Sequence, residues 1–149
     1  MPRVKINKDG TIKLSEHDEQ VALFQWKDAI AREYPDLCMM YAIPNGAFYG
    51  NNMIRIRGKE VPARIIQANR MRAEGLQPGM LDICLPVARD GYHGFYWEMK
   101  VKPNKPSEEQ EWWMEQLAKQ GYKVGWGYGQ DEAKKAICEY MSIPNREFI

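Results

Sequence analysis

Two apolar segments joined by a turn-forming stretch constrain the fold of this chain most. LDICLPV, residues 81 to 87, and FYWEMKV, residues 95 to 101, have the composition of buried strands. ARDGYHG between them has the glycine and aspartate content of a turn. A connection this short makes the two strands neighbours, so we predict an antiparallel hairpin.

Helical patterns surround this hairpin. Apolar periodicity and capping residues predict helices over residues 15–33, 62–74, about 107–120 and 131–141. Shorter apolar runs predict strands at 37–43 and 122–128, the second either at a sheet edge or closely packed, and NGAFYGNN, residues 45 to 52, reads as an irregular loop. The element order predicts a mixed α/β domain in which helices flank a central sheet.

Composition narrows the class of protein. The 149 residues fit one domain, and no segment approaches the roughly 20 apolar residues of a membrane span. The N-terminal residues show no apolar run after their charges, so we expect a protein without a membrane anchor that stays in the cytoplasm of the cell that makes it.

Cysteine and histidine usage limits the kind of metal site. The three cysteines are isolated in the sequence, which favours reduced, mostly buried thiols over disulfides or a zinc ribbon. Only His17 and His93 are present, so a site built on paired imidazoles is hard to assemble. If a metal binds, oxygen atoms must hold it.

The strand 95–101 carries charge on one of its two faces. Alternation places Phe95, Trp97 and Met99 on one face, and Tyr96, Glu98, Lys100 and Lys102 on the other. The first face is expected to be core. Taken alone, Glu98 and Lys100 could be an ordinary ion pair on the wetter side of a half-exposed strand.

Asp82 argues for more than an ion pair. It lies inside the apolar run LDICL, where a carboxylate rarely stands without a partner. In a hairpin, Asp82 and Glu98 can face the same side near one end of the sheet, where they would repel each other unless a cation lies between them. Both carboxylates, with the Met99 carbonyl and water, suit Mg²⁺ or Mn²⁺. Lys100 beside such an ion could orient a water and stabilise charge on a phosphate oxygen, which is the chemistry of phosphodiester hydrolysis.

These residues and their surroundings resemble a known family. SEHDEQVALFQW, AIPNGA, RMRAEGLQPGMLDICLPV, GYHGFYWEMK and SEEQEWWMEQLAKQGYKV, in this order, resemble the virus-type replication-repair nucleases, the VRR-NUC branch of the PD-(D/E)xK superfamily. The resemblance covers about residues 15 to 141. It departs at Leu81, where the family often has a proline that shapes the backbone and binds no metal.

The resemblance implies a fold and an activity. It implies a restriction-endonuclease-like αβββαβ core and a single nuclease domain over residues 1–149. It also implies a Mg²⁺- or Mn²⁺-dependent endonuclease of the phage or replication-repair type, acting on branched or four-way junction DNA as a homodimer. If a phage encodes it, we expect it in the host cytoplasm.

The resemblance also assigns roles to individual positions. Asp82 and Glu98 would hold the metal, with the Met99 carbonyl as a further ligand, and Lys100 would be the catalytic lysine. In the first helix the family's acid matches Glu16, although Glu19 lies more nearly in line with the apolar face. Two glutamines complete the set. Gln20 lies on the same side as Glu16 and is a candidate nucleic-acid contact, while Gln110 matches a polar residue near the metal or phosphate and equally completes a capping box with Ser107.

A basic run between residues 53 and 74 supplies candidate phosphate contacts. These are Arg55, Arg57, Arg64, Arg70 and Arg72. A solvated face is the alternative reading of the same charges. Two other functions stay open: a nucleic-acid-binding module without catalysis, and an interaction domain that uses Trp112, Trp113 and Tyr128 as its interface.

Overall fold

A four-stranded mixed sheet forms the centre of the molecule. The computed structural model describes residues 5–44 and 52–144. The strand order is β1-β4-β5-β6, and the strands are β1 (Tyr41–Ala42), β4 (Ile83–Leu85), β5 (Phe95–Lys100) and β6 (Lys123–Tyr128). β4 pairs antiparallel with β1 and with β5, whereas β6 pairs parallel with β5. Ile83 lies opposite Trp97 and Leu85 opposite Phe95, so the predicted hairpin is confirmed.

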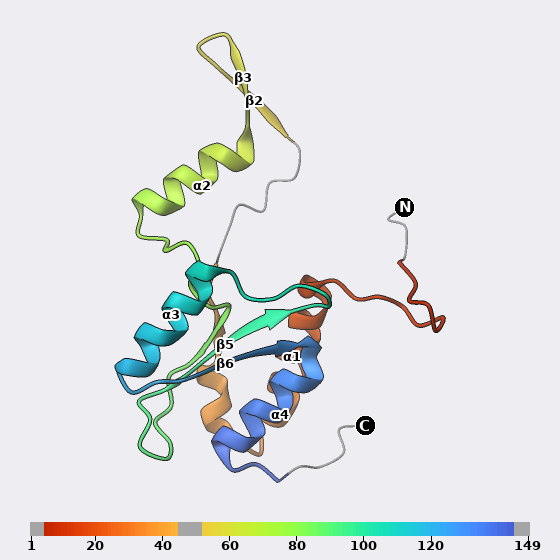
Figure 1. The fold of residues 1–149 in the computed structure, drawn as a ribbon, viewed down its shortest axis with the longest axis vertical. Coiled ribbons are helices and arrows are strands. Elements are labelled where there is room, and N and C mark those ends of the chain that lie inside the picture. Colours follow the sequence, from red (N-terminus) through yellow and green to blue (C-terminus); the bar gives the residue numbers. More distant parts are fainter. Residues whose placement is uncertain (1–4, 45–51, 145–149) are drawn as a thin grey trace.

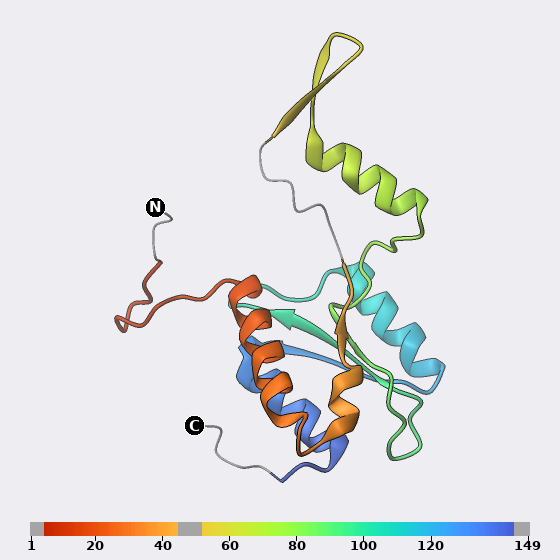
Figure 2. The ribbon, with the colours of Figure 1, turned by 180° about the vertical axis from the view of Figure 1, so that it is seen from behind.

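Helices cover both faces of this sheet. α1 (Glu16–Ile30) and α4 (Gly129–Met141) lie on one face and α3 (Glu108–Lys119) on the other (Figures 1 and 2). α1 begins at a capping box in which the Ser15 hydroxyl accepts from the Asp18 N–H and the Asp18 carboxylate accepts from the Ser15 N–H. Ser107 and Gln110 form the same motif at the start of α3. Both predicted helix starts are confirmed.

The hydrophobic core fills the layer between the sheet and the pair α1 and α4. Leu23, Phe95 and Ile137 are fully buried there. Phe95 and Trp97 stack with their ring centroids 5.9 Å apart. The Trp97 ring lies against β6, where a Cβ at Gly125 or Gly127 would come within 2.7 Å of it. Glycine is therefore required at both positions, and β6 is both an edge strand and a closely packed one, as predicted.

The chain order of these elements gives the expected core. α1, β1, β4, β5, α3 and β6 follow one another as αβββαβ, with α4 added at the end. The protein is a mixed α/β structure with a restriction-endonuclease-like arrangement, as predicted. No helix within the described ranges combines the length and apolar character needed to cross a membrane.

An insertion between β1 and β4 forms a projecting arm. It consists of β2 (Met53–Ile56), β3 (Lys59–Pro62) and α2 (Ala63–Ala73), and we call residues 53–73 the arm. The arm extends away from the sheet and its covering helices (Figure 1). The helix was predicted, but the hairpin was not. Arg57 and Gly58, both with positive φ, form the two-residue turn that joins its strands.

Three further predictions need correction. The strand expected at 37–43 is mostly a 3₁₀ helix, η1 (Pro35–Met39), and only Tyr41–Ala42 pairs with β4. Leu37 and Met40 point into the core with the helical spacing of three residues, which the apolar run concealed. At its far end α1 stops at Ile30, three residues early, and α4 starts at Gly129, two residues early. Residues 45–51 of the predicted loop lie outside the described part of the chain.

The cysteines follow the prediction of reduced, mostly buried thiols. All three are free, with Cys84 and Cys138 buried and Cys38 exposed.

Candidate active site

Two carboxylates meet where β4 begins and β5 ends. Asp82 directly precedes β4, and continuing the register from Ile83 opposite Trp97 sets it opposite Glu98. The Asp82 side chain accepts a hydrogen bond of 2.9 Å from the Met99 N–H, and its carbonyl oxygen accepts one of 2.7 Å from the Ile43 N–H. Strands on both sides therefore hold Asp82 in place.

Glu98 is 2% exposed, and its two oxygens have different surroundings. Oε1 accepts a hydrogen bond of 2.7 Å from the Gln110 amide and lies 3.1 Å from the Lys100 ammonium. Oε2 is buried without a hydrogen-bond partner. Burial, and secondly the charge of Asp82, raise the pKa of Glu98 to about 8, against the opposing effect of Lys100. A buried carboxylate with one unsatisfied oxygen beside a second carboxylate is an arrangement that a cation would relieve.

The donor set at this point fits a hard divalent ion. Carboxylate oxygens of Asp82 and Glu98 and the backbone carbonyl of Met99 are oxygen ligands of the kind that Mg²⁺ and Mn²⁺ prefer. The described residues include no group of three or more His, Cys, Asp or Glu side chains placed to hold a metal. Two carboxylates suffice for Mg²⁺, which commonly takes one or two protein carboxylates and completes its shell with water and substrate phosphate.

Lys100 is not part of an exposed surface pair. Its side chain is 13% exposed, and its partner Glu98 is buried. The reading of these residues as an i,i+2 pair on a wet strand therefore does not fit. The ammonium group instead stands beside the Glu98 carboxylate, on the face of β5 from which Gln110 of α3 reaches Glu98.

Gln110 joins the helix cap to the carboxylate. Its side-chain oxygen accepts from the Ser107 N–H at 2.9 Å, while its amide nitrogen donates to Glu98. The two interpretations of Gln110 left open by the sequence are therefore compatible. The turn before Asp82 packs on the same helix, because the Trp113 indole N–H donates to the Pro78 carbonyl and Gly79 lies against Glu109.

The two candidate acids of α1, Glu16 and Glu19, have other surroundings than the carboxylates of Asp82 and Glu98. Glu16, the first residue of α1, is half-buried and lines a cavity with Val101 and Lys102 just past the end of β5. Glu19 accepts a hydrogen bond of 2.8 Å from the Gln130 N–H at the start of α4. Gln20 is half-buried on the same helix. Neither glutamate joins Asp82 and Glu98 in a described metal-binding group.

The candidate phosphate contacts all lie on the arm. Arg55 and Arg57 belong to the β2–β3 hairpin, and α2 carries Arg64, Arg70 and Arg72. All five are exposed. The structure thus groups them on one projecting element and leaves them apart from the carboxylate pair.

The sequence did not predict that Trp126 lies beside the carboxylate pair Asp82 and Glu98. It pairs in register with Glu98 across the parallel strands β5 and β6. Such a position follows only from the pairing of two strands joined through a helix, and a single sequence carries no local signal for it.

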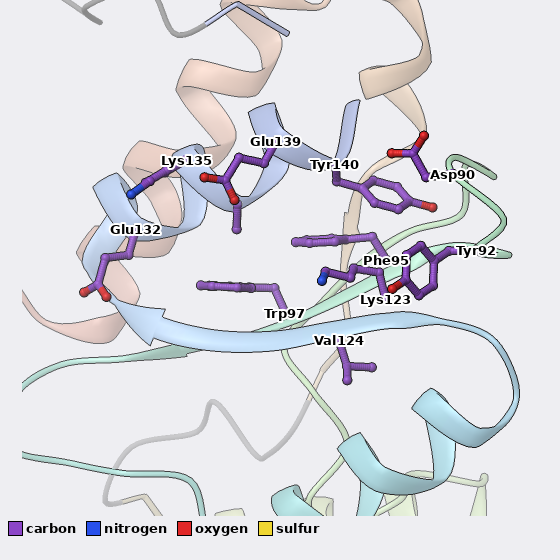
Figure 3. Close-up of a pocket in the computed structure, with 11 residues that line it drawn as sticks. Asp90, Tyr92, Phe95, Trp97, Lys123, Val124, Glu132, Lys135, Glu139 and Tyr140 are labelled. Carbon is purple, nitrogen blue, oxygen red and sulfur yellow. The ribbon is translucent and has the colours of Figure 1, made fainter. Parts of the chain in front are cut away.

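A separate cavity lies on the other face of the sheet. It has a volume of about 550 Å³, and the Phe95 and Trp97 rings lie beneath α4 in its wall (Figure 3). Acidic and basic side chains both line it, including Asp90, Glu132 and Lys123. Because Phe95 and Trp97 alternate with Glu98 along β5, the sheet separates this cavity from the carboxylate pair.

Comparison with known proteins supports the fold. No family model and no curated protein matches the chain. One solved structure similar to it is described as a "VRR_NUC domain protein", with a TM-score of 0.66 and 21% sequence identity. The match covers 88% of this chain and 91% of that one. At this identity the similarity establishes a shared fold, so the expected structural resemblance is confirmed.

Proposed function

We propose that this chain is a divalent-metal-dependent endonuclease of the PD-(D/E)xK type that hydrolyses phosphodiester bonds in DNA. The observation that carries the proposal is the buried carboxylate of Glu98, which has an unsatisfied oxygen beside Asp82 and a lysine at 3.1 Å. The fold shared with a VRR_NUC domain protein supports the same activity.

Each residue of this group has a proposed task. Asp82, Glu98 and the Met99 carbonyl would hold Mg²⁺ or Mn²⁺. The ion would supply positive charge at the phosphate and lower the pKa of water. Lys100 would orient the attacking water and balance charge on the phosphate oxygens. Gln110 would keep Glu98 turned so that Oε2 stays available, because it occupies Oε1.

Glu16 is the proposed additional acid of the site. It lies near the end of β5, in the wall of a cavity that Lys102 also lines. Glu19 is the weaker choice, since its carboxylate already accepts from the α4 backbone.

The arm is the proposed DNA-contacting element, with branched or four-way junction DNA of replication and repair as the preferred substrate. Its five exposed arginines would meet phosphates, and Gln20 would add a contact from α1. Affinity should then fall steeply with salt, because each neutralised phosphate releases counterions.

We also propose that the single nuclease domain works as a homodimer. The arm exposes four large apolar side chains, Met53, Ile54, Ile56 and Ile65, each at least 44% exposed. Exposed apolar side chains concentrated on one projecting element are typical of a surface that another chain covers. A symmetric pair would present two active sites, which suits cleavage of two strands at a branch point.

The direct test is cleavage of labelled supercoiled, flap and four-way junction DNA with Mg²⁺, Mn²⁺ or EDTA. The wild-type protein should cut with either metal and not in EDTA. Lys100→Ala should reduce cleavage at least 100-fold and leave DNA affinity within about 3-fold, since electrostatic groups of this kind act on the transition state.

Lys119→Ala provides the matched control. Lys119 is an exposed lysine at the last residue of α3 that forms a surface ion pair with Glu115, and its loss should not change cleavage. Full activity of Lys100→Ala would refute the assignment. Binding of DNA by wild-type protein without cleavage in any metal would favour the non-catalytic module instead.

A further inference from the structure

Two aromatic side chains stand beside the proposed catalytic residues on the edge strand. In the parallel register of β5 and β6, Glu98 pairs with Trp126 and Lys100 pairs with Tyr128. The Cβ positions of Gly125 and Gly127 face Trp97 on the core side. By alternation Trp126 and Tyr128 therefore point to the side of the sheet that carries Glu98 and Lys100.

Figure 3 shows the same alternation further along β6. The Trp97 ring lies on the α4 side of the strand, while the Val124 side chain extends to the opposite side. Trp126 and Tyr128, two and four residues after Val124, follow it onto that side.

The aromatic pair is available for contact. Both side chains are partly exposed, and neither belongs to the core cluster around Phe95 and Ile137. Their rings meet edge to face with centroids 5.3 Å apart and planes at 86°. β6 is the last strand of the sheet, so no further strand within the described residues pairs with its outer edge, while α3 packs on the same face of the sheet as the two rings.

A cation continues the line of aromatic rings. The Lys102 ammonium lies 5.6 Å from the centre of the Tyr128 ring, and Lys102 is exposed. Together with Lys100, it gives an aromatic strip bordered by positive charge. Proteins bind single-stranded nucleic acid with this combination, in which bases stack on rings and phosphates meet cations.

We propose that Trp126 and Tyr128 stack against an unpaired nucleobase next to the phosphate that is cut. This inference rests on the proposed endonuclease activity and specifies its substrate. Bases inside a duplex are covered by their neighbours and cannot reach a ring on the protein surface. The substrate therefore has at least one unpaired nucleotide beside the scissile phosphate, as in a flap, a splayed end or a junction with an open branch point.

The test measures stacking separately from cleavage. A flap oligonucleotide carries 2-aminopurine at the first unpaired position, and its fluorescence is recorded on addition of protein in EDTA. Wild-type protein should quench the probe, because stacking on an aromatic ring quenches this base. The same probe within a perfect duplex should change little.

Variants of Trp126 give the expected change. Trp126→Ala should abolish most of the quenching. It should weaken flap binding about 10-fold, which is in the range that one base–aromatic stack supplies. Its affinity for the duplex should stay within about 2-fold of the wild-type value. Trp126→Phe should restore part of both signals, because phenylalanine keeps a smaller ring. Trp112→Ala, which removes a 53% exposed tryptophan elsewhere, should behave as wild type. Thermal melting confirms that each variant is folded.

The outcomes separate this inference from the proposed activity. Unchanged quenching in Trp126→Ala, or an equal loss of flap and duplex binding, overturns the stacking surface even if the protein is an active nuclease. Quenching that Trp126→Ala abolishes, in a protein that cuts nothing in Mg²⁺ or Mn²⁺, supports the stacking surface and refutes only the nuclease. A protein that binds neither probe overturns the stacking surface, and the cleavage assay in Mg²⁺ or Mn²⁺ decides the nuclease separately.

Discussion

At the scale of single residues, the unequal environment of the two Glu98 oxygens is the central feature. Oε1 is held by Gln110 and Lys100, whereas Oε2 is buried and unsatisfied. An unsatisfied buried acceptor costs stability on the order of 1–3 kcal/mol, so the fold gains nothing from it alone. Binding of a cation by Asp82 and Glu98 would explain why the chain keeps this arrangement.

Metal-free protein should lose stability as the pH rises towards 8. Glu98 has its pKa raised from 4.5 to about 8 in the folded protein, so between these values the folded state binds more protons than the unfolded state. The free energy of unfolding in EDTA should therefore fall with rising pH, by up to about 1.4 kcal/mol per pH unit. Glu98→Gln lacks the ionising group and should not show this part of the fall. Urea unfolding of both proteins in EDTA between pH 5 and 8.5 measures this pH dependence of the free energy of unfolding.

Glu115→Gln is the control for this pH dependence. Glu115 is exposed on α3, and the variant should keep the wild-type slope. Mn²⁺ in place of EDTA should reduce the loss of wild-type stability at pH 8. Parallel curves for wild type and Glu98→Gln would show that Glu98 ionises normally.

At the scale of elements, the sequence predicted structures that depend on neighbouring residues. It did not predict contacts between distant parts of the chain. Ser15 and Ser107 fixed two helix starts, and the turn between β4 and β5 predicted the hairpin that joins Asp82 to Glu98. The hairpin β2–β3 escaped notice because both faces of β2 are exposed, which removes the apolar–polar alternation of a half-buried strand. Two contacts depend on pairings between distant parts of the chain, for which a single sequence has no local pattern. One places Trp126 beside Glu98, and the other places Glu19 at the start of α4.

Glu19 should stabilise the fold without contributing to cleavage. Its carboxylate accepts from the Gln130 N–H, and α4 has no capping side chain at its own N-cap, Tyr128. Glu19→Ala should therefore lower the free energy of unfolding by about 1 kcal/mol, the usual value of a lost helix cap. Urea unfolding with parallel cleavage assays measures both quantities.

Glu16→Ala is the companion variant. It should reduce metal-dependent cleavage and leave stability nearly unchanged, the reverse of Glu19→Ala. Loss of cleavage in Glu19→Ala at a temperature where it is fully folded would reverse the assignment of the two acids.

At the scale of the whole molecule, the arm and the nuclease core are separate in composition and position. The arm projects from the core (Figure 2). The core surrounds buried Phe95 and Ile137, whereas the arm exposes isoleucines and arginines. In the proposed assembly, one set of arm residues meets a second copy and another meets DNA. The sheet and α3 then carry the reaction, and residues 74–82 join the arm to β4 of that sheet.

Substitution of the arm's apolar residues should break the homodimer. The double variant Ile54→Lys, Ile56→Lys places charge on β2, and light scattering should show a shift from twice 17.4 kDa to 17.4 kDa. Ile12→Lys, at a 63% exposed position outside the arm, should remain dimeric. A wild-type protein that is monomeric at all concentrations would contradict the proposed assembly.

A crystal soaked in Mn²⁺ and measured at the manganese absorption edge tests the central claim most directly. We expect an anomalous peak within bonding distance, about 2.0–2.3 Å, of Glu98 Oε2 and an Asp82 carboxylate oxygen, and no peak there in Asp82→Asn crystals. A wild-type crystal with manganese bound only elsewhere, or with no peak between these two carboxylates, would contradict the account.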